Sequence, residues 1–199
     1  MQQPVTVRAA TREDVDAVVA LVESAYRGEA SRAGWTTEAD LLDGQRTDAV
    51  AVAALVEAPG SVVLLLERDG RLLACCHVEA RPAAGRAEEE RAPAADDRDL
   101  PGASRRLAYL GMLAVDPTRQ GAGAGRAVLA AGVAHARDVL GATDLEMTVV
   151  AQRAELVAWY ERRGWARTGQ TRPFPYGDER FGRPRRPDLE FVVLTRSTG

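Results

Sequence analysis

Apolar residues recur along this chain with the spacing of helices in some segments and of strands in others. Apolar positions three or four apart predict a helix that begins near Thr11 and ends at Arg27. Further helices are predicted at residues 36–42, at 48–57, from a glycine cluster to about 140, and at 153–163. Apolar or alternating runs predict strands at 5–7, 61–67, 71–80, 109–115, 144–150, 165–171 and 188–195. This order indicates a mixed α/β fold.

The strand that ends at Val115 leads directly into a glycine-rich turn. Asp116-Pro117 ends the strand, and Gln120-Gly121-Ala122-Gly123-Ala124-Gly125-Arg126 opens the next helix. Glycines leave backbone N–H groups accessible where a helix N-terminus carries roughly half a unit of positive charge. The pattern therefore predicts a cradle for a diphosphate. The alternative is that three small residues merely ease the packing of the helix.

Particular residues argue against two other phosphate-binding loops. A P-loop requires a Lys before Ser or Thr, whereas all 26 basic residues of this chain are Arg. A dinucleotide fingerprint requires Gly-x-Gly-x-x-Gly. The third glycine position holds Arg126 or Val128 here, depending on the glycine at which the count begins.

Two segments carry a resemblance to a known family. The Gln-x-x-Gly-x-Gly spacing after a strand and a proline resembles motif A of the GNAT N-acetyltransferase superfamily, which binds the pyrophosphate of acetyl-CoA. The segment Glu155–Trp165 is similar to the family's motif B, in which a Tyr on a helix precedes a Gly-aromatic step. The resemblance implies a mixed, mostly antiparallel sheet of six to seven strands, splayed at a central parallel pair, with helices on both faces. It implies acetyl-CoA as cosubstrate, bound by Leu113, Ala114, Val115, Gln120, Gly121, Ala122, Gly123, Ala124, Gly125 and Arg126.

Composition narrows the possible partners. A formal net charge of −3 gives no reason to expect nucleic acid or an anionic membrane surface as partner. We find no signal-peptide pattern and no apolar run near the roughly 20 residues that span a bilayer. Cys75 and Cys76 are adjacent, so on a strand they face opposite ways and form no disulfide framework. We therefore expect a cytoplasmic protein without a metal site, acting as monomer or homodimer.

A single domain is expected over residues 1–199. Residues 81–106 are rich in Ala, Pro, Glu, Asp and Arg and contain almost no large apolar side chain. Such a segment buries too little surface to offset its ordering entropy, so a mobile loop is predicted there. It is either a tolerated insertion or a functional lid.

The chemistry of amine acetylation defines which groups the site needs. A primary ammonium has a pKa near 10, so about one in a thousand is free amine at neutral pH, and a base or a water chain must remove a proton. The thioester carbonyl becomes an oxyanion that requires a backbone donor; in the family fold, the splayed sheet beside Leu113–Val115 supplies it. The departing thiolate benefits from an acid. The resemblance to motif B implies Tyr160 for this role, the alternative being an aromatic residue on the buried face of a helix.

The base is harder to assign. Glu79 lies near the end of the predicted strand 71–80, on the same face as His77. A carboxylate in a cleft has a raised pKa and works at neutral pH, whereas an exposed Glu at the edge of a sheet is the alternative. We take Glu79 as the candidate base, with His77 as the alternative candidate. The family's Asn near the start of the helix 153–163 has no counterpart in Ala151-Gln152-Arg153, so that contact with the coenzyme is not carried over.

Acceptor binding is predicted in two variable stretches. Tyr26, Trp35 and Glu38 follow the first helix, where GNAT proteins build their acceptor wall, and Phe174 belongs to a second aromatic rim. The combination of Trp35, Glu38 and Arg46 suggests a partly polar small molecule. Ordinary anchoring of loops is the alternative for both groups. The expected activity is direct acetyl transfer from acetyl-CoA to the primary amine of a small molecule. A non-catalytic acyl-CoA-binding or regulatory module, acetylation of a protein N-terminus and transfer to aminoacyl-tRNA stay open.

Overall fold

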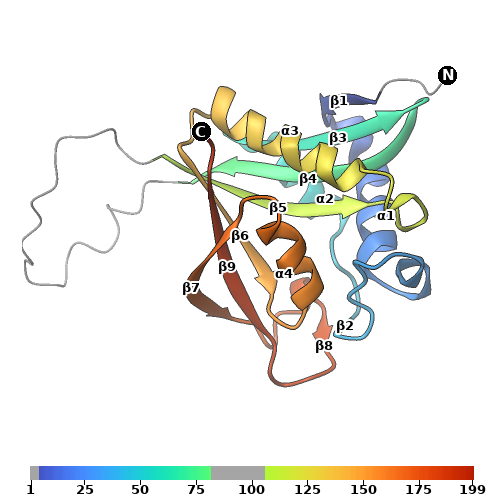
Figure 1. The fold of residues 1–199 in the computed structure, drawn as a ribbon. Helices are drawn as coiled ribbons and strands as arrows, with labels where there is room; N and C mark the ends of the chain where they lie inside the picture. Colours follow the sequence, from blue (N-terminus) through green and yellow to red (C-terminus); the bar gives the residue numbers. More distant parts are fainter. Residues whose placement is uncertain (1–4, 82–105) are drawn as a thin grey trace, which may run out of the picture.

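The computed structural model describes residues 5–81 and 106–199, and a seven-stranded sheet forms the centre of the molecule (Figure 1). Its strand order is β1-β3-β4-β5-β6-β9-β7, and β2 pairs with β8 separately. Neighbours in the large sheet are antiparallel except β5 and β6, which are parallel. The expected mostly antiparallel sheet of six to seven strands is confirmed. The strands are β1 (Thr6–Ala9), β2 (Leu42–Asp43), β3 (Ser61–Arg68), β4 (Arg71–Ala80), β5 (Leu107–Val115), β6 (Asp144–Val150), β7 (Ala166–Pro173), β8 (Arg183–Pro184) and β9 (Glu190–Ser197).

Helices cover both faces of the sheet, as predicted. Helices α1 (Val15–Tyr26) and α2 (Ala49–Glu57) pack on one face, and α3 (Ala124–Asp138) and α4 (Ala154–Glu161) pack on the other. The predicted helix starts are also found: Thr11 and Asp14 form a capping box, and the Asp48 carboxylate accepts the Ala51 N–H at 2.7 Å. Short 3₁₀ turns complete the chain: η1 (Arg12–Asp14), η2 (Glu29–Ala33), η3 (Pro117–Arg119) and η4 (Glu179–Phe181).

Strand β4 is buried on both faces and separates two hydrophobic cores. Because side chains alternate along a strand, Cys75 faces the core beneath α1 and α2, while Cys76 faces the core beneath α3. Both thiols are free and buried, so the prediction that they face opposite ways is confirmed.

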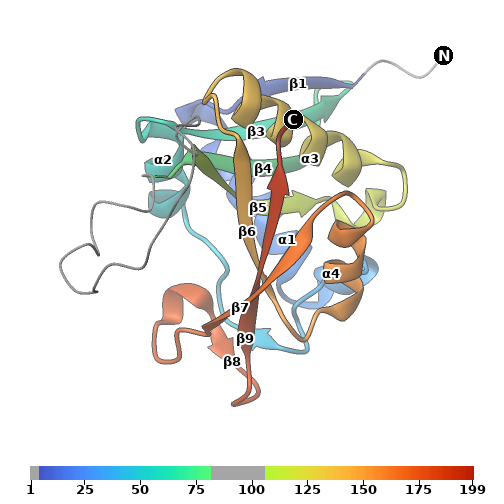
Figure 2. The same cartoon turned by 60° about the vertical axis from the view of Figure 1, so that its left-hand side comes forward.

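The parallel pair is short, and this opens the sheet. Pairing between the two strands is confined to one end, where Leu107–Tyr109 of β5 pairs with Asp144–Glu146 of β6. Beyond that point Met112 adopts φ +45° and the β4–β5 register shifts, so β5 bends away from β6. Figure 2 shows β6, β9 and β7 running steeply across the direction of β3, β4 and β5. The predicted splay is confirmed, and it leaves the end of β5 without a partner strand on one side.

One predicted helix is wrong. Residues 36–42 form turns that lead into β2, and their only helical hydrogen bond of the i→i−4 type runs from the Leu42 N–H to the Glu38 carbonyl, at 2.9 Å. The chain cannot continue as a helix because Gly44 turns it with φ +79° and β2 pairs with β8. The Glu38 side chain is buried, so tertiary contacts override the local helical spacing here.

Two further expectations concern the whole chain. The predicted loop at 81–106 lies, apart from its two end residues, outside the described residues. Within residues 5–81 and 106–199, no helix has both the length and the apolar character needed to cross a bilayer.

Candidate functional site

The glycine cluster forms the N-terminus of α3. The Asp116 carboxylate accepts the Thr118 N–H at 2.9 Å and Pro117 starts η3, so the chain turns sharply after β5. Gly123 is the N-cap residue of α3 and has no side chain with which to cap it. Within the described residues, no group accepts a hydrogen bond from the backbone N–H of any residue from Gly123 to Arg126. Four donors are therefore available at the positive end of a helix dipole.

The three glycines serve different purposes. Gly121 and Gly123 have φ of +84° and +88°, and a Cβ atom added at either would meet no atom within 4 Å. The space in front of both residues is therefore open to a ligand. At Gly125, by contrast, a Cβ would lie 3.3 Å from Val115 Cγ2 and 3.6 Å from the Trp159 ring. Gly125 allows close packing of the helix on β5, so the packing explanation applies to this residue, whereas the open space at Gly121 and Gly123 leaves room for the predicted cradle.

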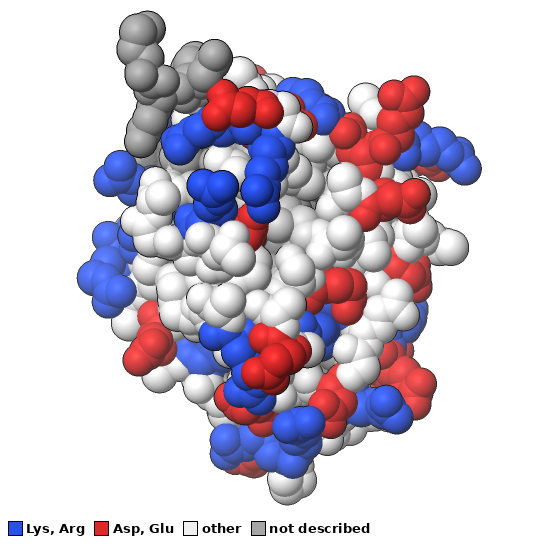
Figure 3. All heavy atoms as spheres, turned by 90° about the vertical axis from the view of Figure 1, so that its right-hand side faces the viewer, with Lys and Arg blue, Asp and Glu red and all other residues white. Residues whose placement is uncertain are grey.

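A cavity of about 570 Å³ lies in front of these amide groups, and we call it the coenzyme cavity. Figure 3 views the molecule from this end and shows acidic and basic side chains interspersed around an uncharged centre. Ala114 faces the opposite core and Ala124 lies outside the lining, so eight of the ten predicted coenzyme residues line the cavity. The lining residues are Trp35, Thr36, Leu113, Val115, Gln120, Gly121, Ala122, Gly123, Gly125, Arg126, Leu156, Trp159 and Arg163.

Two tryptophans form one wall of the coenzyme cavity. The ring centroids of Trp35 and Trp159 lie 6.2 Å apart, and the Arg163 guanidinium lies 3.7 Å from the Trp159 ring centroid. The Gln120 side chain accepts the Trp35 N–H at 2.9 Å and donates to Thr36 Oγ1 at 2.8 Å. The structure thus places Trp35, expected at the acceptor, beside the glycine loop instead.

A second, smaller cavity of about 130 Å³ lies where β5 and β6 diverge, and we call it the splay pocket. Leu113 and Leu156 line both cavities, so the two meet at these residues. Tyr26 lines the splay pocket, and its hydroxyl donates to the Leu113 carbonyl at 2.5 Å. Tyr160 lines it from α4, on the opposite side of the sheet.

Tyr160 has the features of a proton donor. Its side chain is buried, and no described residue forms a hydrogen bond with its hydroxyl. Burial raises the pKa of Tyr160 above its ordinary value, with a smaller contribution from Tyr26. The hydroxyl therefore keeps its proton at neutral pH and has no protein acceptor to which it is committed.

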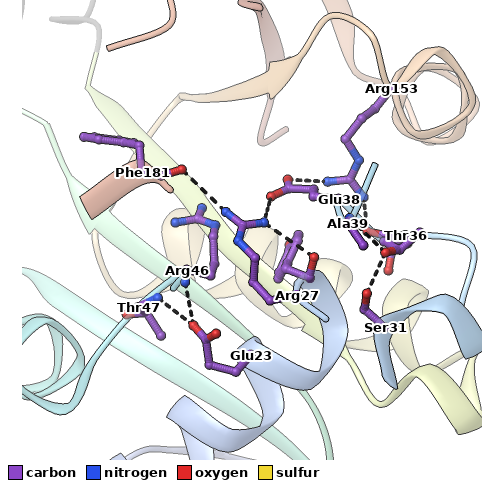
Figure 4. A network of polar contacts seen from close by, with 12 residues as sticks. Glu23, Arg27, Ser31, Thr36, Glu38, Ala39, Arg46, Thr47, Arg153 and Phe181 are labelled. Carbon is purple, nitrogen blue, oxygen red and sulfur yellow. Dashed lines mark hydrogen bonds and ion pairs between the residues drawn. The ribbon is translucent and has the colours of Figure 1, made fainter. Parts of the chain in front are cut away.

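Glu38 connects three segments at the side of the splay pocket (Figure 4). One carboxylate oxygen accepts from Arg27 Nη1 at 2.5 Å and the other from Arg153 Nη1 at 2.8 Å. Arg153 also donates to the Thr36 carbonyl. Burial opposes ionisation of Glu38, but Arg153, Arg46 and Arg27 outweigh it and hold its pKa below the ordinary value. Glu38 lines the pocket as a charged, fully paired group.

The other predicted site residues lie elsewhere. Glu79 is partly exposed, pairs with Arg81 at 2.9 Å and lines neither cavity. His77 is buried with its Nε2 2.8 Å from Ser61 Oγ, and burial lowers its pKa. Phe174 lies in a small core with Leu42, Val150 and Leu189, so it contributes to neither cavity.

Several lining residues were missed in the sequence. Trp159 and Arg163 lie in the segment that resembles motif B, and their spacing of four on the helix was the available signal. Arg153 lines the splay pocket from the residue before α4, beside Arg46, which the sequence analysis had already associated with the acceptor. Nothing in their local sequence indicated that they meet.

The fold and the amide-lined cavity suit a transferase that binds an anionic coenzyme, and comparison with known proteins is more specific. The model of the acetyltransferase (GNAT) family matches residues 17–165. The chain therefore belongs to the GNAT acetyltransferase family.

Individual proteins resemble the chain either over a short segment or at low sequence identity. A mycothiol acetyltransferase of Salinispora tropica is 43% identical over 64 residues, which is 32% of this chain and 21% of that protein. The match thus spans about a fifth of the relative's length. Among solved structures, the ribosomal-protein-alanine N-acetyltransferase of Brucella melitensis has a TM-score of 0.65 and 21% identity, covering 96% of this chain and 99% of that one. YncA of Salmonella typhimurium, solved with acetyl-CoA, has a TM-score of 0.61 and 21% identity over 98% and 94% of the two chains. At such low identity, the two structural matches show a shared fold and nothing more.

Proposed function

We propose that this chain transfers the acetyl group of acetyl-CoA directly to the primary amine of a small molecule. The observation that carries the proposal is the set of unpaired N–H groups from Gly123 to Arg126, since three of these four residues, Gly123, Gly125 and Arg126, line the coenzyme cavity. These amides suit a diphosphate. The splay pocket shares Leu113 and Leu156 with that cavity, so an acceptor there would lie next to a bound thioester.

The reaction requires two proton movements. Starting from the free amine, the acceptor nitrogen forms a bond to the thioester carbon while the carbon–sulfur bond breaks, so one proton leaves the nitrogen and one reaches the sulfur. We assign the second proton to Tyr160, whose hydroxyl is protonated and uncommitted. Beyond Tyr109, amide groups on the β6 side of β5 have no partner strand, which supports their use as oxyanion donors.

Glu79 remains the proposed base, acting through water. It is the cross-strand partner of Tyr109, and partners in register share a face of the sheet. Tyr109 lines the splay pocket, so only one side chain separates Glu79 from it. This arrangement supports a relay rather than direct contact with the acceptor.

Thermal unfolding tests the coenzyme part of the proposal. At acetyl-CoA 100-fold above its Kd, mass action adds about 2.7 kcal/mol of stability, which raises Tm by roughly 5–10 °C for a chain of this size. Gly123→Val should abolish the increase because its side chain fills the space in front of the amides. Gly177→Val is the matched control, since Gly177 also has φ +88° and open space but lines neither cavity.

Release of free thiol from acetyl-CoA, followed over a panel of amines, tests the transfer. Coenzyme-dependent stabilisation with no thiol release on any amine would favour the non-catalytic module. A Tm that does not respond to acetyl-CoA in the wild type would refute the cradle itself.

A further inference from the structure

The side of the splay pocket carries more positive than negative charge. Arg27 and Arg153 share the two oxygens of Glu38, at 2.5 and 2.8 Å. Glu23 is the other carboxylate of this cluster, and it accepts the backbone N–H of Arg46 at 2.6 Å. Three guanidinium groups therefore face two carboxylates, leaving one positive charge in excess. Buried or half-buried charge of one sign is costly unless a partner supplies the other.

The excess charge is located at Arg46. Both Glu38 oxygens are already taken, and within the described part of the chain no hydrogen bond or ion pair reaches the Arg46 guanidinium (Figure 4). The side chain is half-buried and lines the splay pocket. Its Cζ atom lies 5.6 Å from the Tyr26 ring centroid, and Arg153 Cζ lies at the same distance from that ring. The Tyr26 ring thus holds Arg46 in position without satisfying its donors.

We propose that the acceptor amine also carries a carboxylate, and that Arg46 binds this carboxylate in the splay pocket. This inference rests on the proposed acetyl transfer and specifies its substrate class. A planar guanidinium donates two parallel hydrogen bonds to a carboxylate, which fixes orientation as well as position. A bound carboxylate would also bring the cluster to three positive and three negative charges. The pocket, at about 130 Å³ against about 570 Å³ for the coenzyme cavity, suits the amino and carboxyl groups of a small amino acid.

Matched pairs of amines test the substrate class. Glycine, alanine and phenylalanine are compared with glycinamide, alaninamide and phenylalaninamide, with thiol release from acetyl-CoA as the readout. Amidation lowers the pKa of the amine, so intrinsic reactivity at neutral pH favours the amides. We expect the wild type to have the higher kcat/KM for the acids, which then reflects the protein. Higher kcat/KM for the amides would overturn the inference while leaving acetyl transfer intact, and so would a preference for O-phosphoethanolamine over every amino acid.

Substitution of Arg46 locates the contact. Arg46→Gln should raise KM for the acids roughly 10- to 100-fold, the range expected for a lost charged hydrogen bond. The KM for the amides and the Kd of acetyl-CoA should change much less, so the ratio of kcat/KM for acid to kcat/KM for amide falls. Arg12→Gln removes an exposed Arg paired with Glu57, far from both cavities, and is the control for loss of charge alone. An equal loss on acids and amides would refute the carboxylate contact.

A binding measurement keeps the inference testable if no amine of the panel is turned over. Calorimetry with coenzyme A-saturated protein compares N-acetylglycine with N-acetylglycinamide in wild type and Arg46→Gln. We expect tighter binding of the acid, lost in the variant. Equal binding of both compounds by the wild type would overturn the inference, while absence of thiol release would count against the proposed function alone.

Discussion

Replacing Tyr160 with phenylalanine separates the proton donor from the core residue. The ring packs among buried residues of the core beneath α3 and α4, and phenylalanine fills almost the same space. What disappears is one hydroxyl that no described residue bonds. The two possible roles of Tyr160 therefore predict different combinations of turnover and stability.

The magnitudes follow from these contacts. Removing general-acid help costs about 10²-fold or more in turnover, which is close to 3 kcal/mol of barrier. No protein hydrogen bond is lost, so the free energy of unfolding should change by less than about 1 kcal/mol. The Kd of acetyl-CoA should stay within a few-fold. Because burial keeps the pKa of Tyr160 above its ordinary value, the wild-type rate should not fall between pH 7 and 9 through loss of this proton.

The assay combines thiol release on an active acceptor, calorimetric titration of acetyl-CoA and urea unfolding. Tyr176→Phe is the informative comparison. The Tyr176 hydroxyl donates to the Arg186 carbonyl at 3.1 Å and accepts the Leu189 N–H at 2.6 Å. Its loss should therefore lower stability by about 1 kcal/mol and leave turnover unchanged. Near-normal turnover in Tyr160→Phe would refute the acid assignment.

Two other substitutions address charged groups. Glu38→Gln leaves Arg27 and Arg153 buried without a carboxylate, so urea unfolding should show a loss of about 3–5 kcal/mol. Folding lowers the pKa of Glu38, so its contribution to the free energy of unfolding is present at neutral pH and is lost as the pH falls through the folded-state pKa. The stability of the variant should therefore depend less on acid pH than that of the wild type. An unchanged pH profile of stability would contradict this. Glu79→Gln should lower kcat about 10²-fold at pH 7, with partial recovery at higher pH where more amine is free. Wild-type kcat at pH 7 in this variant would show that Glu79 only pairs with Arg81.

Much of the fold was predictable because local patterns carry it. Strand–turn–glycine–helix order around Gly123 depends on residues adjacent in sequence, and so does the alternation that sends Cys75 and Cys76 into different cores. The incorrect helix at 36–42 has the opposite origin. Glu38 is fixed by Arg27 and by Arg153, which is 115 positions away, and no local pattern contains that pairing.

The candidate site was also predictable only where its residues are close in sequence. The glycine loop was found because its chemistry is a property of backbone and spacing. Trp35 was predicted as an acceptor residue, but its location depends on Gln120, 85 positions later. Arg46 was associated with a partly polar acceptor, but only the structure shows that no carboxylate among the described residues pairs with its guanidinium.

The stretch from Trp35 to Glu38 forms part of the wall of both cavities. Trp35 is fixed to the glycine loop through Gln120, and Glu38 is fixed to the start of α4 through Arg153. Under the proposed function, substitutions here that alter acceptor binding would also disturb the wall of the coenzyme cavity. Arg46 lines only the splay pocket, so under the proposed function its substitution would change acceptor binding without disturbing the wall of the coenzyme cavity.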